Sequence, residues 1–252
     1  MLKKRIIPME LFYEGRLYKT KRFSEPRDVG CPIKSSAVYS DQDADELILV
    51  NIDREKKFSD SFVSAVAKIA ENCYVPLSVG GGITKYAEVE RLFAAGADKV
   101  IINSAAYRDK NFISQISKSF GAQAVIVSID VKRGGDGCYA LYSECAMKLE
   151  NVGLAQHVEQ VLQSGVGEIM VQAIDRDGVM GGYDLDLLAE TVRLSSVPVI
   201  LAGGAGSFID LLEAFRAGAD AVACGSLFNF GDNNPLRAKA FLNNYEVKLK
   251  RV

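Results

Sequence analysis

Short apolar runs alternate with longer amphipathic stretches along the 252 residues of the chain. The runs are typical of buried strands, whereas the intervening stretches repeat apolar residues at helical spacing. Strands are expected at residues 5–9, 46–52, 75–79, 99–103, 124–130, 168–174, 197–202 and 221–226. Helices are expected at residues 60–73, 87–97, 157–167 and 185–196. This alternation predicts a parallel sheet covered by helices, and eight strands are enough to close it into a (β/α)8 barrel.

An internal repeat supports closure of the sheet. The same offset of 122 residues separates the glycine pairs that begin at 81 and 203, the two AGAD segments at 95 and 217, Glu46 from Glu168, and Asp53 from Asp175. Four equal offsets indicate two homologous halves of four strands each. An open, doubly wound sheet is the alternative, but the duplication favours a TIM barrel that forms one domain, 1–252. Its half-barrels are expected at about 1–122 and 123–252.

Composition narrows the range of partners. The 30 basic and 32 acidic residues are dispersed along the chain and nearly balance, which argues against nucleic acid as the main partner. Five cysteines without a CxxC pair and a single histidine argue against a zinc site, so we expect reduced thiols, no metal and no cofactor. Because no apolar run approaches the length of a membrane span, we expect a cytoplasmic protein with no membrane contact.

Glycine-rich turns follow the third and seventh strands, and serine-bearing turns follow the fourth and eighth. The residues concerned are Gly82, Asn103 and Ser104 in the first half, and Gly203, Gly204, Gly225 and Ser226 in the second. Glycine allows a ligand to approach the backbone, and N–H groups at the start of a helix favour an anion. The glycines could instead serve only tight turns. Their pairing with serine turns favours a phosphate site in each half, and hence a ligand with a phosphate at each end.

Four charged residues stand at the starts of predicted strands. They are Arg5, Glu46, Lys99 and Glu168, which we call the charged ring. Two positive and two negative groups around one end of a barrel could form a salt-bridged plug that closes it, or a gate.

Acidic residues also stand near the ends of strands, where barrel enzymes place their catalytic groups. Asp130 ends the fifth strand and is a candidate acid or base, although it could equally cap or brace a loop. Asp175 and Asp177 fit ordinary turn chemistry. His157 is expected at a surface position without a role.

Glu10, near the end of the first strand, is expected to face away from the barrel axis. With period-two alternation, a strand that turns Arg5 inward also turns Ile7, Met9 and Leu11 inward. Only a one-residue slip of the strand would bring Glu10 inside, and it would turn Arg5 outward. This position is therefore expected to lack an inward carboxylate.

The segments DELILVNID, VGGGI, AGADKVIINSAA, GEIMVQAIDRDG and AGADAVACGSLF together resemble the HisF-type cyclase subunit of imidazole glycerol phosphate synthase. The likeness covers essentially the whole chain. It implies a duplicated (β/α)8 barrel that receives ammonia from a docked glutaminase at one end. At the other end the ammonia would meet a substrate that carries two phosphates.

The resemblance also implies roles for single residues. It makes the charged ring the ammonia gate, and it places Asp98 on the glutaminase-docking face. It assigns Gly82, Asn103 and Ser104 to one phosphate site, and Gly203, Gly204, Gly225 and Ser226 to the other. Asp130 matches one of the two catalytic aspartates of the family.

The chain departs from the family at the catalytic end. Leu11 stands where the second catalytic aspartate belongs, and Asn51, Cys31 and Gln172 replace two aspartates and a threonine. One positioned acid or base typically contributes about 10²–10⁴-fold to a rate. We therefore expect cyclase activity to be lost.

A branch of the family fits these departures better. The segment GRLYKTKRF and the VGCPI that follows it resemble HisF-like proteins of acetamidino-sugar pathways in surface polysaccharide biosynthesis. That likeness implies an ammonia-channelling subunit that works with a HisH-like glutaminase and an N-acetyl sugar amidotransferase. The alternatives are the cyclase of histidine biosynthesis and a phosphate-ligand binding protein without a channel.

Overall fold

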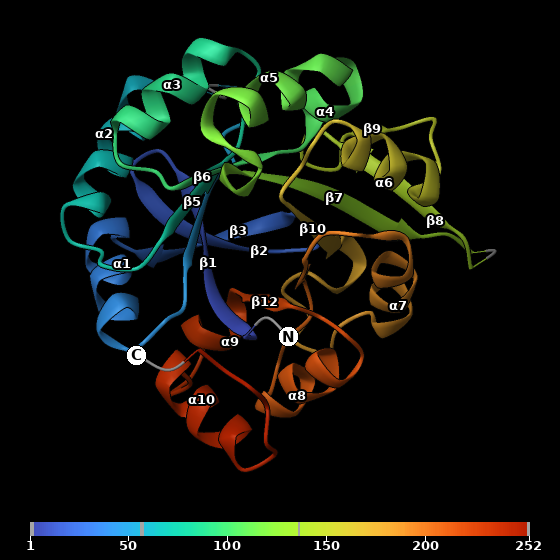
Figure 1. Cartoon of the computed structure of the whole chain (residues 1–252). Helices are drawn as coiled ribbons and strands as arrows, with labels where there is room; N and C mark the ends of the chain where they lie inside the picture. Colours follow the sequence, from blue (N-terminus) through green and yellow to red (C-terminus); the bar gives the residue numbers. More distant parts are fainter. Residues whose placement is uncertain (1–2, 56–57, 136, 251–252) are drawn as a thin grey trace.

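Eight parallel strands form a closed barrel in the computed structural model, which describes residues 3–55, 58–135 and 137–250 (Figure 1). In barrel order they are β1 (Arg5–Tyr13), β4 (Leu47–Asn51), β5 (Leu77–Gly80), β6 (Lys99–Ile102), β7 (Val125–Arg133), β10 (Glu168–Ala173), β11 (Val199–Ala202) and β12 (Ala221–Cys224). The barrel closes because β1 pairs with both β4 and β12, and β10 pairs with both β7 and β11. The predicted (β/α)8 fold is confirmed.

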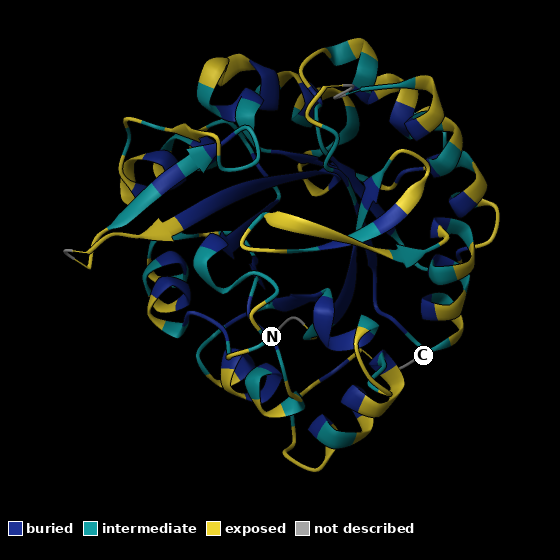
Figure 2. Cartoon of the chain, turned by 180° about the vertical axis from the view of Figure 1, so that it is seen from behind, coloured by how far each residue is buried: buried dark blue, intermediate teal, exposed yellow. Residues whose placement is uncertain are grey.

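Helices surround the strands on the outside of the barrel. The long ones are α1 (Pro32–Asp41), α2 (Asp60–Ala70), α3 (Tyr86–Ala94), α5 (Lys110–Phe120), α6 (Leu154–Gln163), α7 (Leu185–Leu194), α8 (Phe208–Arg216) and α10 (Pro235–Asn243); α4 (Ser104–Arg108) and α9 (Ser226–Asn229) are short. Figure 2 shows their exposed residues on the outer sides and the buried ones toward the strands. In α2 the buried side chains are Phe62, Val66 and Ile69, the spacing of one helical face.

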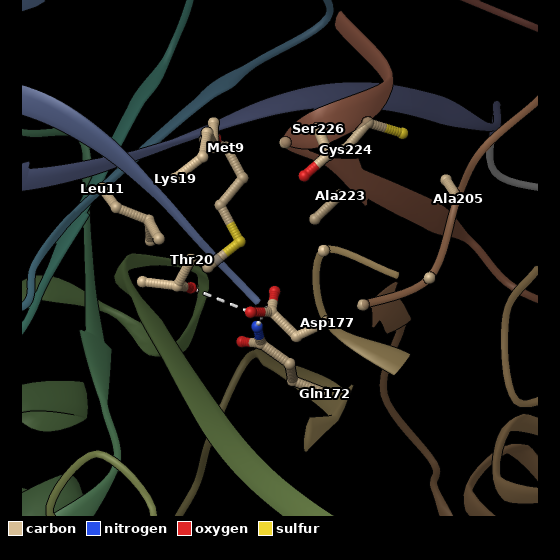
Figure 3. A pocket seen from close by; sticks show the side chains of 14 residues that line it. Met9, Leu11, Lys19, Thr20, Gln172, Asp177, Ala205, Ala223, Cys224 and Ser226 are labelled. Atoms are coloured by element: carbon tan, nitrogen blue, oxygen red, sulfur yellow. Dashed lines mark hydrogen bonds between the residues drawn. The ribbon is translucent and has the colours of Figure 1, made fainter. Parts of the chain in front are cut away.

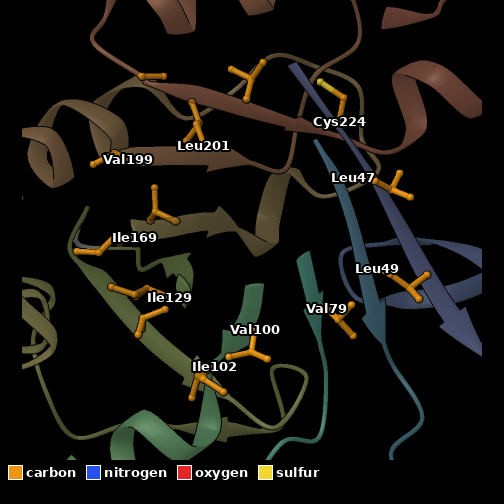
Figure 4. Packing of buried hydrophobic residues seen from close by; sticks show 14 of the residues in the cluster. Leu47, Leu49, Val79, Val100, Ile102, Ile129, Ile169, Val199, Leu201 and Cys224 are labelled. Carbon is orange, nitrogen blue, oxygen red and sulfur yellow. The ribbon is translucent and has the colours of Figure 1, made fainter. Parts of the chain in front are cut away.

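The buried apolar residues form two clusters. The larger one fills the space between strands and helices and includes Leu47, Leu49 and Val79 (Figure 4). The smaller one fills the barrel interior, with Ile7, Met9, Ile48, Ile101, Ile126, Met170, Ile200, Ala202, Ala221 and Ala223, and with Leu11 and Val50 packed against it. Adjacent residues of one strand belong to different clusters, as alternation along a strand requires. The inward orientation predicted for Ile7, Met9 and Leu11 is confirmed.

Two hairpins extend the barrel beyond its rim and were absent from the predicted elements. The first hairpin consists of β2 (Arg16–Lys21) and β3 (Ser24–Gly30), paired to the end of β1. The second hairpin consists of β8 (Tyr139–Ser143) and β9 (Lys148–Leu149), paired to the end of β7. Most of β3 is exposed and polar. Such a strand carries no hydrophobic alternation and is formed by backbone pairing to a neighbour.

The strand register repeats between the halves with the offset found in the sequence. Leu47 pairs with Leu77 between β4 and β5, and Ile169 pairs with Val199 between β10 and β11. Each residue of the second pair follows its counterpart by 122 positions. The repeat therefore extends from motifs to backbone pairing.

His157 is a correction to the sequence analysis, because it is buried rather than at the surface. It lies on the buried face of α6 with Leu154, Val158 and Val161, and its ring stacks on Tyr107 at 4.0 Å between centroids. Burial lowers the pKa of its imidazole to about 4. The side chain is therefore a neutral packing residue at physiological pH.

Replacing Gly81 with alanine is expected to lower the free energy of unfolding by about 1–3 kcal/mol, the usual range for a strained backbone position. Gly81 has a φ of 95°, and a Cβ there would lie 2.0 Å from the carbonyl oxygen of Asn51. Urea unfolding of Gly81→Ala measures the loss. Gly135→Ala is the control, because a Cβ at Gly135 meets nothing within 4 Å. Equal midpoints for both variants would contradict the prediction.

Candidate functional site

The charged ring lies at the end of the barrel where the strands begin. Lys99 Nζ lies 3.0 Å from Glu46 Oε2 and 2.6 Å from Glu168 Oε1. Arg5 Nη1 lies 2.8 Å from Glu46 Oε2, and the Arg5 guanidinium also pairs with Glu168. Each cation thus contacts both carboxylates, and the four predicted residues form one closed network.

Burial and pairing oppose each other in the ring. The side chains of Glu46 and Glu168 are only 3% and 10% exposed. Burial alone would raise the pKa of Glu168, but its contacts with Arg5 and Lys99 outweigh burial and hold that pKa below its usual range. Burial likewise disfavours the charged form of Arg5, yet the two carboxylates raise its pKa. Arg5 and Glu168 therefore remain charged at neutral pH.

Asp98 lies beside the ring and braces the barrel end. Its Oδ2 accepts a hydrogen bond of 2.8 Å from the backbone N–H of Leu77. Asp220, its counterpart in the second half, accepts one of 3.1 Å from the backbone N–H of Val199. Asp98 is nevertheless exposed. The structure thus gives it a bracing contact, while its docking role stays a prediction.

A cavity opens at the other end of the barrel, which we call the mouth. It is lined by Met9, Leu11, Lys19, Thr20, Gln172, Asp177, Gly178, Gly203, Gly204, Ala205, Ala223, Cys224, Gly225 and Ser226 (Figure 3). All four residues of the second predicted phosphate site are among them. The cavity measures about 30 Å³, and the first hairpin contributes Lys19 and Thr20 to its lining, with the Thr20 hydroxyl donating to Asp177 at 2.9 Å.

Lys19 supplies the cation of this cavity, and sequence reasoning gave it no role. Its side chain is buried, its Nζ donates to the carbonyl oxygen of Met9, and a Cβ at Gly225 would lie 2.8 Å from that Nζ. Burial lowers its pKa to about 8, partly offset by the charges of Glu10 and Asp177. An ammonium group beside Gly225 and the Ser226 turn suits an anion. The basic segment RLYKTK was the only signal available.

The first predicted phosphate site lies at the ends of β5 and β6, outside the lining of this cavity. The Asn103 side-chain amide donates to the carbonyl oxygen of Ser128 at 3.1 Å. The Ser104 hydroxyl accepts a 3.0 Å hydrogen bond from the backbone N–H of Glu144, in the second hairpin. The two predicted phosphate sites are thus separate, as expected for two halves. The second hairpin contacts the first site, and the first hairpin contacts the second site.

Asp130 lies on the inner side of β7 at the mouth. Its carboxylate accepts a hydrogen bond of 3.2 Å from the Ser128 hydroxyl. Burial, reinforced by the charge of Asp177, raises its pKa to about 7, although the contact with Ser128 opposes this shift. A carboxyl group that titrates near neutrality is suited to general acid and base chemistry.

The first strand offers no inward carboxylate to pair with Asp130. Leu11 lines the cavity, whereas Glu10 is buried on the helix side of β1. There Glu10 accepts a hydrogen bond of 2.9 Å from the Ser36 hydroxyl of α1, and burial raises its pKa. The outward orientation predicted for Glu10 is confirmed.

The structure also places the other three departures from the family. Asn51 is buried, and its side-chain oxygen accepts a hydrogen bond from the backbone N–H of Asp53. Gln172 lies opposite Asp130 in the β7–β10 register, and Cys31 is exposed.

Comparison with known proteins places this barrel in a family. Residues 13–234 match the family described as "Histidine biosynthesis protein". The imidazole glycerol phosphate synthase subunit HisF of Alkaliphilus metalliredigens is 36% identical over 252 residues, the full length of both chains. The chain belongs to the HisF family. Another member, the HisF subunit of Thermotoga sp. strain RQ2, is 37% identical over 250 residues, 99% of this chain and 98% of its own.

A further HisF relative is 40% identical over 234 residues, covering 91% of this chain and 92% of its own. It is named putative imidazole glycerol phosphate synthase subunit hisF2 of Pseudomonas aeruginosa. These names do not show the acetamidino-sugar branch, and they agree better with the histidine-pathway alternative.

In the described part of this HisF-family chain, no helix is long and apolar enough to cross a membrane. Among the same residues, no cluster of three or more acidic, histidine or cysteine side chains could hold a metal ion.

Proposed function

We propose that the chain is the barrel subunit of a two-component glutamine amidotransferase. A HisH-like glutaminase docks at the charged ring, and the ammonia it releases is used at the mouth. The observation that carries this proposal is the ring itself, in which Lys99 contacts both Glu46 and Glu168 on the barrel axis. It stands opposite a cavity that holds a lysine and a serine turn.

The barrel interior favours ammonia over ammonium. Between ring and mouth the axis is lined by apolar residues such as Ile7, Ile48 and Ile126. An ion loses its hydration in such surroundings at a cost of several kcal/mol or more. Passage of a neutral molecule therefore needs only a transient separation of ring contacts, and the interior keeps bulk water from following.

Two reactions are candidates at the mouth. The names of relatives that span the whole chain support the cyclase of imidazole glycerol phosphate synthase, with Asp130 as its acid or base. The second candidate is delivery of ammonia to an N-acetyl sugar amidotransferase in acetamidino-sugar synthesis. The specific observation in its favour is Leu11, which lines the cavity where the resemblance calls for a carboxylate.

Docking is tested by mixing the chain with a HisH-like glutaminase. We expect a complex in size-exclusion chromatography and faster glutamine hydrolysis than by the glutaminase alone. Asp98→Asn should weaken the complex without changing the thermal midpoint by much, since an amide oxygen can still accept from Leu77. Absence of both complex and stimulation at low salt, where charged contacts are strongest, would refute the proposed pairing.

The reaction is tested with Leu11→Asp, which restores a carboxylate to the mouth. With ammonium salt and the cyclase substrate, we expect the variant to cyclise at least about 10²-fold faster than the natural chain, the typical contribution of one acid or base. Leu11→Asn is the matched control, with similar shape and no ionisable group. Family-typical turnover by the natural chain, with no gain in Leu11→Asp, would instead establish the cyclase candidate.

A further inference from the structure

Two peptide units in the lining of the mouth cavity have carbonyl oxygens bonded to groups that do not line it. The carbonyl oxygen of Gly204 accepts a hydrogen bond of 3.0 Å from the backbone N–H of Gly182. The carbonyl oxygen of Gly225 accepts one of 3.1 Å from the backbone N–H of Phe228, in α9. It also accepts one of 2.9 Å from the side-chain amide of Asn229. Asn229 thus holds the Gly225 peptide by a side chain.

These bonds determine where the N–H of the next residue points. In a trans peptide the C=O and N–H bonds point in opposite directions, and the described chain contains no cis peptide. Because the Gly225 carbonyl is held on the α9 side, the N–H of Ser226 points to the other side, toward the cavity that both residues line (Figure 3). This N–H therefore faces the same cavity as the ammonium group of Lys19, and the two donors together suit a phosphate oxygen.

The equivalent turn of the first half shows what the amide adds. Asn103 there has φ and ψ of −120° and −87°, close to the −103° and −80° of Gly225. Tyr107 stands 122 positions before Asn229, but its ring stacks on His157 and its hydroxyl has no hydrogen-bond partner among the described residues. The turn conformation thus forms without a side-chain amide. The amide adds a second bond to the carbonyl, which polarises the peptide and strengthens its N–H as a donor.

Asn229 is itself held in place from α1. Its amide nitrogen also donates to the Tyr39 hydroxyl at 3.3 Å, and the ring of Tyr39 packs against Phe228 at 6.2 Å between centroids. A side-chain amide has two N–H donors, so one can serve Tyr39 while the other serves Gly225. Rotation of the amide would break both bonds. These contacts therefore fix the orientation of the amide.

We infer that Asn229 is a positioning residue of the mouth, which holds the Gly225–Ser226 peptide with its N–H directed at a phosphate group of the ligand. Asn229 does not line the cavity, so it acts through this peptide rather than by touching the ligand. The inference rests on the phosphate-binding mouth of the proposed function. Since the conformation of the turn does not depend on the amide, Asn229 acts on phosphate affinity more than on folding.

The test compares Asn229→Ala with Asn229→Ser in titrations with inorganic phosphate. A serine hydroxyl in a helix can donate to the carbonyl four residues earlier, which is that of Gly225, whereas alanine has no donor. We expect the dissociation constant to rise about 3–10-fold in Asn229→Ala, the effect of one hydrogen bond, and to rise less in Asn229→Ser. NMR of the isotope-labelled chain follows the Ser226 amide, whose proton phosphate should shift downfield in the natural chain and by less in Asn229→Ala.

Asn233→Ala is the matched control, because it removes the same side chain beyond the end of α9 and should leave the dissociation constant unchanged. Lys19→Met should abolish binding, which assigns the phosphate to this cavity. An unchanged dissociation constant in Asn229→Ala, equal constants in the alanine and serine variants, or a Ser226 amide that phosphate does not shift would overturn the inference. Circular dichroism establishes folding of each variant. The titration uses neither glutaminase nor ammonium, so failure of ammonia transfer and failure of this inference are recognised separately.

Discussion

Glu46→Ala is expected to lower the free energy of unfolding by about 3–5 kcal/mol, the range found when one partner of a buried ion pair is removed. Glu46 contacts Arg5 and Lys99 and accepts a 2.5 Å hydrogen bond from the Ser78 hydroxyl. Without it, two cations with side chains only 16–18% exposed share Glu168 alone. Urea unfolding at neutral pH measures the loss.

An exposed ion pair is the control for the ring. Asp60 pairs with Arg91 at 2.5 Å, but their side chains are 91% and 48% exposed. Asp60→Ala should therefore cost no more than about 1 kcal/mol. Equal losses in the free energy of unfolding for Glu46→Ala and Asp60→Ala would contradict the prediction. They would show that the charged ring contributes no more to stability than an exposed ion pair.

Asp130→Asn is expected to lower ammonium-dependent turnover by about 10²–10⁴-fold while making the protein more stable at alkaline pH. The substitution is made in the natural chain or in Leu11→Asp, whichever shows cyclase activity, and its turnover is compared with that of the same parent. The loss follows because asparagine cannot exchange a proton. The gain in stability follows because the carboxylate of Asp130 is buried and its pKa is raised to about 7.

The sign of the pH effect follows from the raised pKa. Below about pH 4 Asp130 is protonated in both the folded and the unfolded chain, so its ionisation contributes nothing. As the pH rises toward 7 and beyond, the unfolded chain ionises first and folding becomes less favourable. A difference of about three pKa units corresponds to about 4 kcal/mol, so Asp130→Asn should gain up to that amount at pH 8 relative to pH 4.

Unfolding of both proteins in urea at pH 4 and pH 8 provides the comparison. Asp41→Asn, at an exposed position, should change stability by less than about 0.5 kcal/mol at either pH. If the difference in free energy of unfolding between Asp130→Asn and the natural chain were the same at both pH values, the pKa of Asp130 would not be raised by folding. Its proposed role in proton transfer near neutral pH would then be rejected.

The barrel and its inward and outward positions could be predicted because they depend on local periodicity. Leu47 and Ile48 follow from alternation within β4, and the orientation of Glu10 follows from Arg5 in the same strand. Closure of the sheet into a barrel was predicted from the internal repeat, because the pattern of a single strand does not indicate whether a sheet is open or closed. His157 could also have been placed correctly, since it lies at helical spacing from Leu154 and Val161.

The hairpins and their contributions to the mouth could not be predicted in the same way. Lys19 becomes a site residue only because β2 folds back over Gly225, more than 200 positions away in the sequence. Glu144 meets Ser104 only because a polar hairpin pairs with β7 beyond the rim. These contacts depend on backbone pairing of polar segments, and a hydrophobic pattern carries no information about them.

The charged ring also constrains how the duplicated halves could have come together. The first half supplies Arg5, Lys99 and Glu46, and the second supplies only Glu168, because Ala124 and Ala221 occupy the positions equivalent to the two cations in the strand register. Two copies of the first half would bring four cations to two carboxylates, and two copies of the second would bring two carboxylates and no cation. Only one half of each kind gives a neutral ring. The ring therefore selects an unlike pair of halves and disfavours assembly of either half with itself.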